Sequence, residues 1–375
     1  MDKQHTLTLN SGQIKLELLL SGINPNSRIQ LNDQDAPQRY VYDTSNNYEG
    51  HLPSEIILPG GVISNIYFSK DSDWSIQGQM LQHKNQNISG ITFTPDAKFT
   101  KLNLNSGISA SKVAIMYGLD IFAVFLNKTC AYFSNDNDCH FCGLEYTKKN
   151  AGRENIQNPT LNQVVEVFQL ALKQDFDSFN NVMITSGAYE NPDQGIRKQM
   201  EYLLRMKQLQ GNKRVKYHLV TVPPKSRELL KELSEHGPDT IAFDIEVFNQ
   251  DLFSKYCPGK EKQIGYKDYL RIFEDAAKIF PANAVKAGFV LGLEPIESLV
   301  EGMEFFGKLG VSSSLNIFHP DLGSKLQHEP RPDKEYVVEA LKQQKRIMQA
   351  HNLIPIFPNY GRRSSLDTEV YKGML

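Results

Sequence analysis

The segment YKDYLRIFEDAAKIFPANAVKAGFVLGL (residues 266–293) contains a helix pattern followed by a strand pattern. Residues 266–280 have the mixed polar and apolar composition of an amphipathic helix, and residues 284–293 are almost continuously apolar. A short, continuously apolar run is typical of a strand that is buried on both faces, as in a parallel sheet. The segment therefore predicts one helix–strand unit of an α/β protein.

The same alternation extends to both sides of this segment. We predict strands at 121–126, 181–186, 217–222, 240–246, 284–293 and 314–318. We predict helices from Thr160, where Gln163 completes a capping box, and over about 195–209, 227–235, 266–280, 297–308 and 334–350. Successive units with right-handed crossovers form either a barrel or a doubly wound sheet. Six units favour a partial (β/α)6 TIM-like barrel, which we expect over residues 113–345.

The regions that flank this alternation differ from it. Residues 1–112 contain short apolar segments separated by turn residues, such as GQIKLELLL (12–20) and EIILPGGVISNIYF (55–68). They predict a smaller β-rich N-terminal region made of short strands. Residues 346–375 predict a C-terminal strand followed by a polar tail.

Composition limits the class of protein. The 375 residues carry 41 Lys and Arg against 43 Asp and Glu, which gives a net charge of −2. A nearly neutral chain has no bulk electrostatic attraction to nucleic acid or to an anionic membrane. The start of the chain is polar, unlike a signal peptide, and the apolar stretch at 119–126 is too short to span a bilayer. We expect a cytoplasmic protein; its oligomeric state is left open.

Three of the four cysteines lie in CAYFSNDNDCHFCGLEY (130–146), in the loop after the first predicted strand. Clustered cysteines in a reducing compartment indicate metal binding or catalysis rather than a disulfide framework. A structural zinc site needs a fourth ligand, for which His140 is the nearby candidate. A [4Fe–4S] cluster held by three thiolates leaves one iron open, and the spacing favours this reading. Cys257, in YCPGK, is either a further ligand or an ordinary buried cysteine.

The cysteine segment resembles the motif of the radical S-adenosylmethionine (radical SAM) superfamily, C-x3-C-x-aromatic-C. The sequence from Cys139 to Cys142 reproduces the second half, whereas the first gap has eight residues instead of three. The resemblance implies that Cys130, Cys139 and Cys142 hold three irons of one [4Fe–4S] cluster. The amino and carboxylate groups of S-adenosylmethionine would bind the fourth iron, and Phe141 would lie near the adenine.

Three later segments resemble parts of the superfamily that bind S-adenosylmethionine. Thr185, Ser186 and Gly187 resemble the glycine-rich segment that contacts the methionine amino group, although the usual sequence is Gly-Gly-Glu. Glu246 ends the fourth predicted strand, where a polar side chain reaches the ribose or methionine part. The segment from Gly288 to Glu294 resembles the one that recognises adenine, through Gly288, Gly292 and Leu293.

The resemblance also implies a reaction. The reduced cluster would cleave S-adenosylmethionine to a 5′-deoxyadenosyl radical, which abstracts hydrogen from a small polar metabolite, with a reductase, flavodoxin or ferredoxin as electron donor. Only Cys257 remains for a second cluster, so we expect one, and no cobalamin-binding signature is found. The segments ITSGAYENPDQG and YCPGK resemble radical SAM proteins of nitrilase-type gene clusters. A peptide-modifying radical enzyme and a non-catalytic metal-binding scaffold stay open as alternatives.

Four residues are candidates for substrate contact. His319 follows the sixth predicted strand, and His218 lies on the third. Arg362 and Arg363 lie in the polar segment FPNYGRRSSLDTEVYKG (357–373), where a guanidinium can bind a carboxylate or phosphate. Each candidate also has a purely structural interpretation. His319 would be hydrogen-bonded to the next loop, His218 would be a core residue, and Arg362 and Arg363 would lie in a solvated tail.

Overall fold

The computed structural model describes residues 9–24, 40–43, 48–53, 55–67, 69–94, 96–146 and 158–375. Its main sheet has seven strands in the order β15-β14-β13-β12-β11-β10-β9, and the six from β10 to β15 are parallel. This confirms the six predicted strands and the partial barrel. The bounds are β10 (Ile121–Phe125), β11 (Asn181–Thr185), β12 (Lys216–Thr221), β13 (Thr240–Glu246), β14 (Val285–Leu291) and β15 (Ser312–Ile317). An additional edge strand, β9 (Ala114–Tyr117), pairs antiparallel with β10.

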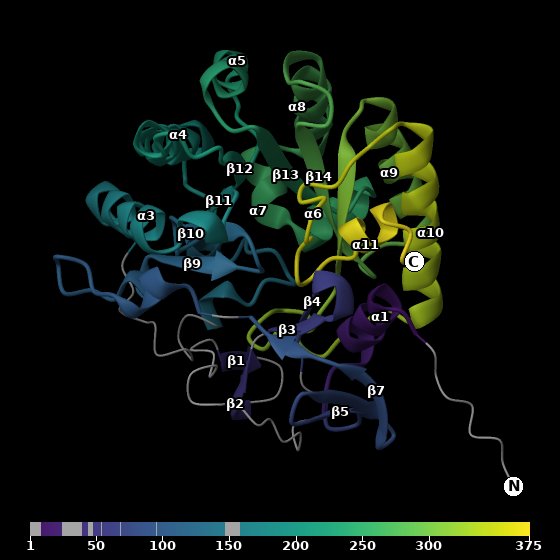
Figure 1. The fold of residues 1–375 in the computed structure, drawn as a ribbon. Helices are drawn as coiled ribbons and strands as arrows, with labels where there is room; N and C mark the ends of the chain where they lie inside the picture. Colours follow the sequence, from purple (N-terminus) through teal and green to yellow (C-terminus); the bar gives the residue numbers. More distant parts are fainter. Residues whose placement is uncertain are drawn as a thin grey trace, which may run out of the picture.

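The crossover helices form an arc outside the parallel strands (Figure 1). They are α3 (Leu161–Gln174), α4 (Pro192–Leu209), α5 (Arg227–His236), α8 (Tyr266–Ile279), α9 (Ile296–Lys308) and α10 (Lys334–Ala350). The predicted capping box is present, because Thr160 accepts from the Gln163 amide and the Gln163 side chain accepts from the Thr160 amide. Two short helices that the sequence analysis missed, α6 (Gln250–Tyr256) and α7 (Pro258–Gln263), lie between β13 and α8.

An apolar core fills the space between the sheet and these helices. Phe122 of β10 packs against Phe168 of α3 with ring centroids 5.3 Å apart, and Phe243 of β13 packs against Phe273 of α8 at 5.5 Å. All seven residues of β14 are buried, as its continuous apolar run predicted. Full burial of such aromatic side chains stabilises the barrel by about 1.5–3 kcal/mol each. The rigid sheet then holds the loops at its carboxyl edge.

The N-terminal region is β-rich, as predicted, with its sheets below the barrel in Figure 1. Its strands are β1 (Tyr40–Asp43), β2 (Tyr48–Pro53), β3 (Glu55–Leu58), β4 (Val62–Asn65), β5 (Trp74–Gln77), β6 (Met80–His83), β7 (Gln86–Gly90) and β8 (Thr92–Phe93). They form separate small antiparallel sheets with their own apolar core, which includes Trp74. Several side chains between Ala97 and Val113 pack into the barrel core. The domain boundary that we predict at residue 112 stays a prediction.

The segment 12–20, expected as a strand, is instead a helix. Helix α1 (Ser11–Ser21) begins at Asn10, whose side chain and that of Gln13 form a capping box. Its apolar residues point in two directions: Ile14 and Leu18 join the N-terminal core, whereas Leu16 and Leu19 join the barrel core. A helix buried on two sides has no single apolar face, and the alternation therefore looked like a strand.

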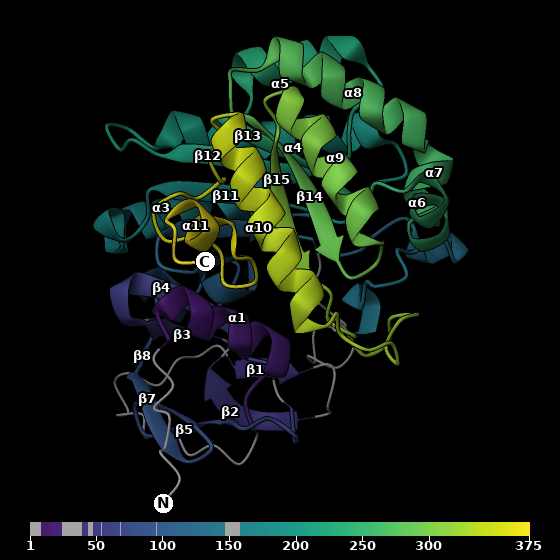
Figure 2. The same cartoon turned by 90° about the vertical axis from the view of Figure 1, so that its right-hand side faces the viewer.

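The expected C-terminal strand is also wrong. Residues 353–366 contain no strand, only an isolated antiparallel bridge between Ser365 and Asn316 of β15. Pro355 and Pro358 interrupt this stretch, and proline cannot donate to a strand ladder. The chain then forms α11 (Asp367–Tyr371), which lies between α10 and α1 (Figure 2). Asp367, Thr368 and Glu369 are buried, so this end of the chain is not a solvated tail.

Among the described residues, there is no helix with the length and apolarity needed to cross a bilayer.

Candidate active site

The cysteine loop is fastened to the segment that follows the neighbouring strand. Leu126 N–H donates to the Thr185 carbonyl, and Ala131 N–H donates to the Ala188 carbonyl, both at 2.9 Å. The Asn127 side chain also donates to the Ala188 carbonyl at 3.1 Å. Both segments leave the carboxyl ends of parallel strands, which is the edge where α/β proteins carry their ligand sites.

Gly187 is required by the close approach of this loop. A Cβ at this position would lie 2.2 Å from the Thr129 carbonyl oxygen and 3.0 Å from the Cys130 Cβ. Any side chain here would displace the first cysteine. The structure therefore brings Gly187 next to Cys130, where the sequence predicted a contact with the same cofactor.

The three cysteines are half-buried and lie near one another. Burial raises the pKa of Cys130 and raises the pKa of Cys142 to about 12. The pKa of Cys139 is raised well above its usual value, first by a hydrogen bond with the Cys257 thiol and then by burial. Cys257 is fully buried, in contrast to the other three. Iron binding must therefore displace protons from these thiols, because the thiolate is the ligand.

Glu246 and Lys260 form a buried ion pair beside the cysteine loop. The Lys260 ammonium lies 2.6 Å from Glu246 Oε1 and also donates to the Asp244 carbonyl. Burial alone lowers the pKa of Lys260, but Glu246, Tyr269 and Cys139 outweigh it, and the pKa is raised well above its usual value. Glu246 has φ +73°, a conformation that L-residues rarely adopt. The carboxylate is thus held in a fixed direction by its partner and its backbone.

Two glycines of the β14 segment are also explained by close contacts. A Cβ on Gly288 would lie 2.0 Å from Asp244 Oδ1 of the neighbouring strand. Gly292 has φ +98°, and a Cβ there would lie 2.8 Å from the Pro332 side chain. Leu293 is buried next to it. The predicted adenine-recognition segment is therefore backbone that is packed closely at the carboxyl edge of the sheet.

The comparison with known families decides what this arrangement is. The profile described as "Radical SAM superfamily" matches residues 135–306, a span that includes Cys139, Phe141, Cys142 and every strand from β11 to β14. Residues 135–306 of this chain are therefore similar to the radical SAM superfamily. The match begins at residue 135, so it leaves out Cys130.

One curated relative is 29% identical over 119 residues, which are 32% of this chain and 30% of the relative: bacteriochlorophyllide c C-7(1)-hydroxylase from Chlorobaculum limnaeum. The chain thus spans about a third of the length of that protein. Similar solved structures include the coproporphyrinogen III oxidase HemN from Escherichia coli, with TM-score 0.42, 13% identity, and coverage of 62% of this chain and 53% of that chain. The hydrogenase maturase HydG from Carboxydothermus hydrogenoformans has TM-score 0.46, 15% identity, and coverage of 63% and 53%.

Members of the radical SAM superfamily bind a [4Fe–4S] cluster and S-adenosylmethionine, and residues 135–306 match the model of that family. The donor set fits the cluster. Among the residues that the structure describes, no three His, Cys, Asp or Glu side chains converge as the ligands of a single ion do. The thiolates of a cluster bind separate irons and need no common centre. Cys130, Cys139 and Cys142 meet that requirement from one loop.

Glu294 lies at the carboxyl edge of the sheet, and the sequence analysis did not single it out by itself. Its carboxylate accepts from the amides of Phe248 and Asn249 at 2.9–3.0 Å, and from the Ser298 hydroxyl at 2.7 Å. It thereby joins the loops that follow β13 and β14. The sequence analysis also missed Lys260, although it noted the YCPGK segment in which this residue lies.

Replacing Glu294 with Ala is expected to lower the free energy of unfolding by about 1.5–3 kcal/mol, because two buried amides lose a charged acceptor. Denaturant unfolding measures this change. Glu297→Ala, at an exposed position in the first turn of α9, is the control and should cost within about 0.5 kcal/mol. Equal losses in the two variants would contradict this role.

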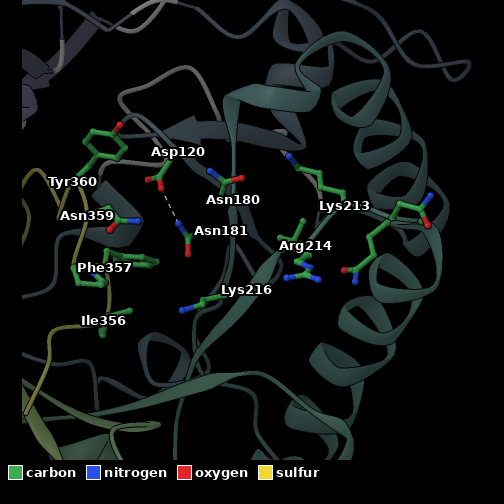
Figure 3. Close-up of a pocket in the computed structure, with 15 residues that line it drawn as sticks. Asp120, Asn180, Asn181, Lys213, Arg214, Lys216, Ile356, Phe357, Asn359 and Tyr360 are labelled. Atoms are coloured by element: carbon green, nitrogen blue, oxygen red, sulfur yellow. Dashed lines mark hydrogen bonds between the residues drawn. The ribbon is translucent and has the colours of Figure 1, made fainter.

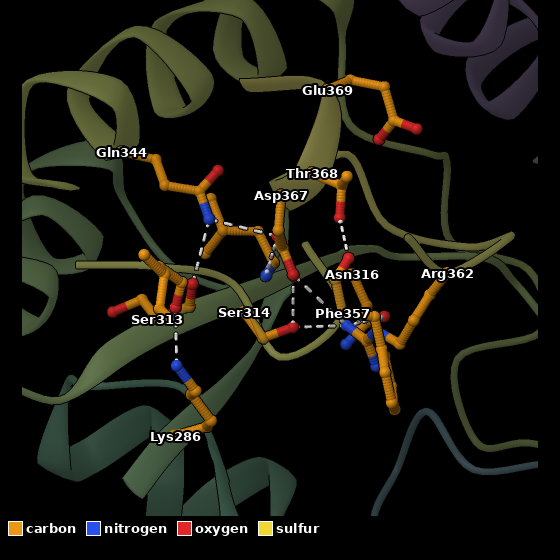
Figure 4. A network of polar contacts seen from close by, with 12 residues as sticks. Lys286, Ser313, Ser314, Asn316, Gln344, Phe357, Arg362, Asp367, Thr368 and Glu369 are labelled. Atoms are coloured by element: carbon orange, nitrogen blue, oxygen red, sulfur yellow. Dashed lines mark hydrogen bonds and ion pairs between the residues drawn. The ribbon is translucent and has the colours of Figure 1, made fainter. Parts of the chain in front are cut away.

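The substrate candidates fall into two groups. Arg362 points toward β15 (Figure 4), where it donates to the Ser314 hydroxyl and to Asn316 Oδ1 at 3.3 Å, and lies 3.6 Å from Asp367. His218 is buried; its Nδ1 lies 2.7 Å from Thr240 Oγ1, and its Nε2 has no hydrogen-bond partner among the residues that the structure describes. Burial lowers the pKa of His218, and the nearby Arg362 guanidinium lowers that pKa further.

His319 and Arg363 instead lie against the N-terminal region. The His319 ring stacks on Tyr67 with centroids 4.2 Å apart, and its nitrogens contact Asp321 at 2.8 Å and Arg331 at 2.7 Å. Arg363 pairs with Glu55 at 3.3 Å and lies over the Tyr117 ring. Both nitrogens of His319 are thus occupied in this structure. The substrate roles of these residues stay predictions.

His218 predicts a pH dependence of stability. Burial lowers its pKa to about 3, against about 6.5 in an unfolded chain. Between these values only the unfolded state binds the proton, so stability rises with pH through this window and is complete above it. Below about pH 6.5, each pH unit should lower the free energy of unfolding by about 1.4 kcal/mol, because buried His218 stays unprotonated in the folded state. Unfolding free energies near pH 5 and pH 7 should show a smaller difference in His218→Gln than in the wild type. His236→Gln, at an exposed position, should behave as wild type; equal slopes in all three would contradict the prediction.

A pocket of about 440 Å³ lies away from this site (Figure 3). Its lining comes from residues just before or at the start of β10, β11 and β12, including Asp120, Asn181 and Lys216, and from the segment 356–360. These positions are at the amino ends of the strands, whereas the cysteine loop follows a carboxyl end. The pocket therefore lies at the opposite edge of the sheet from the cysteine loop.

Proposed function

We propose that this protein is a radical SAM enzyme that abstracts hydrogen from a small polar metabolite. The observation that carries the proposal is the arrangement at the carboxyl edge of the sheet. There the cysteine loop, the Gly187 segment and the Glu246–Lys260 pair lie together. When bound, the cluster supplies one electron that cleaves S-adenosylmethionine into methionine and a 5′-deoxyadenosyl radical.

The chain's own residues hold and orient these groups. Cys130, Cys139 and Cys142 would hold the cluster as thiolates. Backbone groups of Thr185, Ser186 and Gly187 would meet the methionine amino group, since the Ser186 hydroxyl already accepts from Gln199 at 3.1 Å. A rigid backbone donor or acceptor costs little ordering entropy on binding.

The remaining cofactor contacts come from β13, β14 and the cysteine loop. Glu246, fixed by Lys260, would accept from the ribose or the methionine amino group. Gly288, Gly292 and Leu293 would recognise adenine through their backbone, with Phe141 packed near it. Phe141 is partly buried against the barrel core, which gives the ring a fixed position.

The substrate would lie against polar side chains of the barrel. Lys286 is buried on β14, where its ammonium donates to the Ile354 carbonyl at 2.6 Å. Burial lowers the pKa of Lys286 to about 7. Lys286 is the second residue of β14 and His218 the third of β12, so both lie toward the amino ends of the strands, and Arg362, which reaches Ser314 and Asn316 of β15, is the candidate that we retain for substrate contact. An electron donor such as a reductase, flavodoxin or ferredoxin would reduce the cluster.

The test uses a cell extract split by ultrafiltration after protease treatment. The reconstituted enzyme, with dithionite and S-adenosylmethionine, should form 5′-deoxyadenosine faster when the protease-resistant, low-mass fraction is added. Stimulation by the untreated high-mass fraction alone would instead favour a peptide substrate and overturn this proposal.

A further inference from the structure

The pocket at the amino ends of β10, β11 and β12 has the size of a small-molecule site, since its volume is about 440 Å³. It lies at the opposite edge of the sheet from the cysteine loop, so a ligand bound there does not take part in the radical reaction proposed above. Figure 3 shows three parts of its lining: a basic side, an aromatic side, and a group of polar residues between them.

The basic side is formed by the chain that leads from α4 into β12, with Lys213, Arg214 and Lys216. Lys213 is buried and fixes this chain, because its ammonium donates to the Phe176 carbonyl and lies 4.6 Å from the centroid of the Phe179 ring. Arg214 and Lys216 are exposed, and neither side chain has a hydrogen-bond or ion-pair partner among the residues that the structure describes. Two cations therefore line the pocket with their donors unused.

The aromatic side is the segment 356–360, which ends at Tyr360. The segment is fixed from behind, because the Phe357 carbonyl accepts from the Thr368 hydroxyl at 2.8 Å. Tyr360 is 42% exposed, and a Cβ on Gly61 would lie 3.5 Å from its ring, so the N-terminal region packs against this ring. An exposed aromatic ring in a fixed position offers a stacking surface to a flat ring of a ligand.

The polar residues between the two sides are Asp120, Asn180 and Asn181 (Figure 3). The Asp120 carbonyl accepts from the amides of both asparagines at 3.1 Å, and the Asn181 side chain donates to Asp120 Oδ2 at 2.8 Å. Lys216 N–H donates to the Asn180 carbonyl at 3.0 Å, which joins these residues to the basic side. This part of the pocket is therefore fixed and carries both donors and acceptors, as recognition of hydroxyl groups requires.

The charges indicate which anion fits. The lining has three cations, Lys213, Arg214 and Lys216, against one carboxylate, Asp120, in a chain whose net charge is −2. A phosphate monoester carries a charge of about −1.5 to −2 at pH 7, whereas a carboxylate carries −1. Two cations with unused donors therefore match a phosphate monoester, to which a guanidinium can bind through two nitrogens.

We propose that this pocket is a second ligand site, which binds a nucleoside monophosphate. The base stacks on Tyr360, the sugar hydroxyls lie against Asp120 and the asparagines, and the phosphate binds Arg214 and Lys216. The site does not depend on the proposed function, because it shares no residue with the cysteine loop or with the segments expected to hold S-adenosylmethionine.

The test is isothermal titration calorimetry of the full chain with uridine monophosphate (UMP). Stacking tolerates any base, and UMP lacks the adenine of S-adenosylmethionine, so it does not report on that cofactor. UMP should bind with one site per chain, and about tenfold or more tightly than uridine or ribose 5-phosphate, which lack the phosphate and the base respectively. A dissociation constant for UMP above about 1 mM, or equal to that of uridine, would overturn the proposal.

Variants of the pocket test where UMP binds. Arg214→Gln and Lys216→Gln should each weaken UMP binding about tenfold and leave uridine binding unchanged, because each removes a charged donor to phosphate. Tyr360→Ala should weaken UMP binding about fivefold or more, whereas Tyr360→Phe keeps the ring and should stay within about twofold. Arg205→Gln, at an exposed position of α4 outside the pocket, is the control and should bind as the wild type does.

These side chains are exposed or half-exposed, so the variants should fold as the wild type does. UMP affinity that is unchanged in Arg214→Gln, Lys216→Gln and Tyr360→Ala would show that UMP binds elsewhere and would overturn the proposal. An equal loss of affinity in Arg205→Gln would also overturn it, because the effect would then come from the net charge of the chain rather than from the pocket.

Discussion

Alanine in place of Cys130, Cys139 or Cys142 is expected to lower bound iron from about four per chain toward zero and to abolish 5′-deoxyadenosine formation. Each thiolate would hold a different iron, and the one further thiol of the sequence, Cys257, is buried in the core. Iron analysis and product chromatography after anaerobic reconstitution measure both effects.

Cys257→Ala is the matched control for these variants, since it removes a thiol from the same neighbourhood and should keep its iron. Cys130→Ala is the most informative single variant, because Cys130 lies before the span that matches the superfamily. Full iron in Cys130→Ala would contradict the assignment of the widened first gap.

The second large effect is expected at the contact between the two ends of the chain. Lys15 of α1 pairs with Glu369 of α11 at 2.9 Å, and both side chains are almost completely buried. Lys15 also donates to the Arg362 carbonyl at 2.7 Å. Lys15→Met leaves a buried carboxylate without its partner and should lower the free energy of unfolding by about 3–5 kcal/mol.

Lys334→Met is the control for this variant. Lys334 pairs with Glu17, also on α1, but the Lys334 side chain is exposed, so its removal should cost about 0–1 kcal/mol. Denaturant unfolding compares the two. Equal losses would show that the Lys15–Glu369 pair does not fasten the C-terminal segment.

The barrel could be predicted from the sequence because its strands are buried on both faces. In a buried parallel sheet, a short apolar run such as TIAFDIE predicts a strand, and β13 spans the predicted residues 240–246. A helix that begins with a capping box could also be predicted, as Thr160 and Gln163 show for α3. In each case, local pattern and tertiary environment favour the same structure.

The errors lie where two parts of the chain share one element. Helix α1 buries residues in both the barrel core and the N-terminal core. Its pattern of apolar residues therefore depends on packing partners that the local sequence does not reveal. The charged residues Asp367 and Glu369 looked solvated, yet Gln344 and Lys15 satisfy them from distant helices. Pairings over such separations cannot be read from spacing alone.

At the site, the sequence indicated the cysteines and glycines but not the contacts that fix them. Gly187 was singled out by resemblance, whereas the structure gives the reason, which is the approach of Thr129 and Cys130. The Glu246–Lys260 pair needed the fold, because the two residues come from a strand and a later helix. The eight-residue gap places Cys130 beside the segment after β11.

The most direct test of the central claim is the reaction of the anaerobically reconstituted wild-type protein with dithionite and S-adenosylmethionine. A protein with one cluster held by three thiolates should bind about four irons and release 5′-deoxyadenosine and methionine in equal amounts, only when dithionite is present. Binding of about eight irons, or no 5′-deoxyadenosine from an iron-loaded protein, would contradict it.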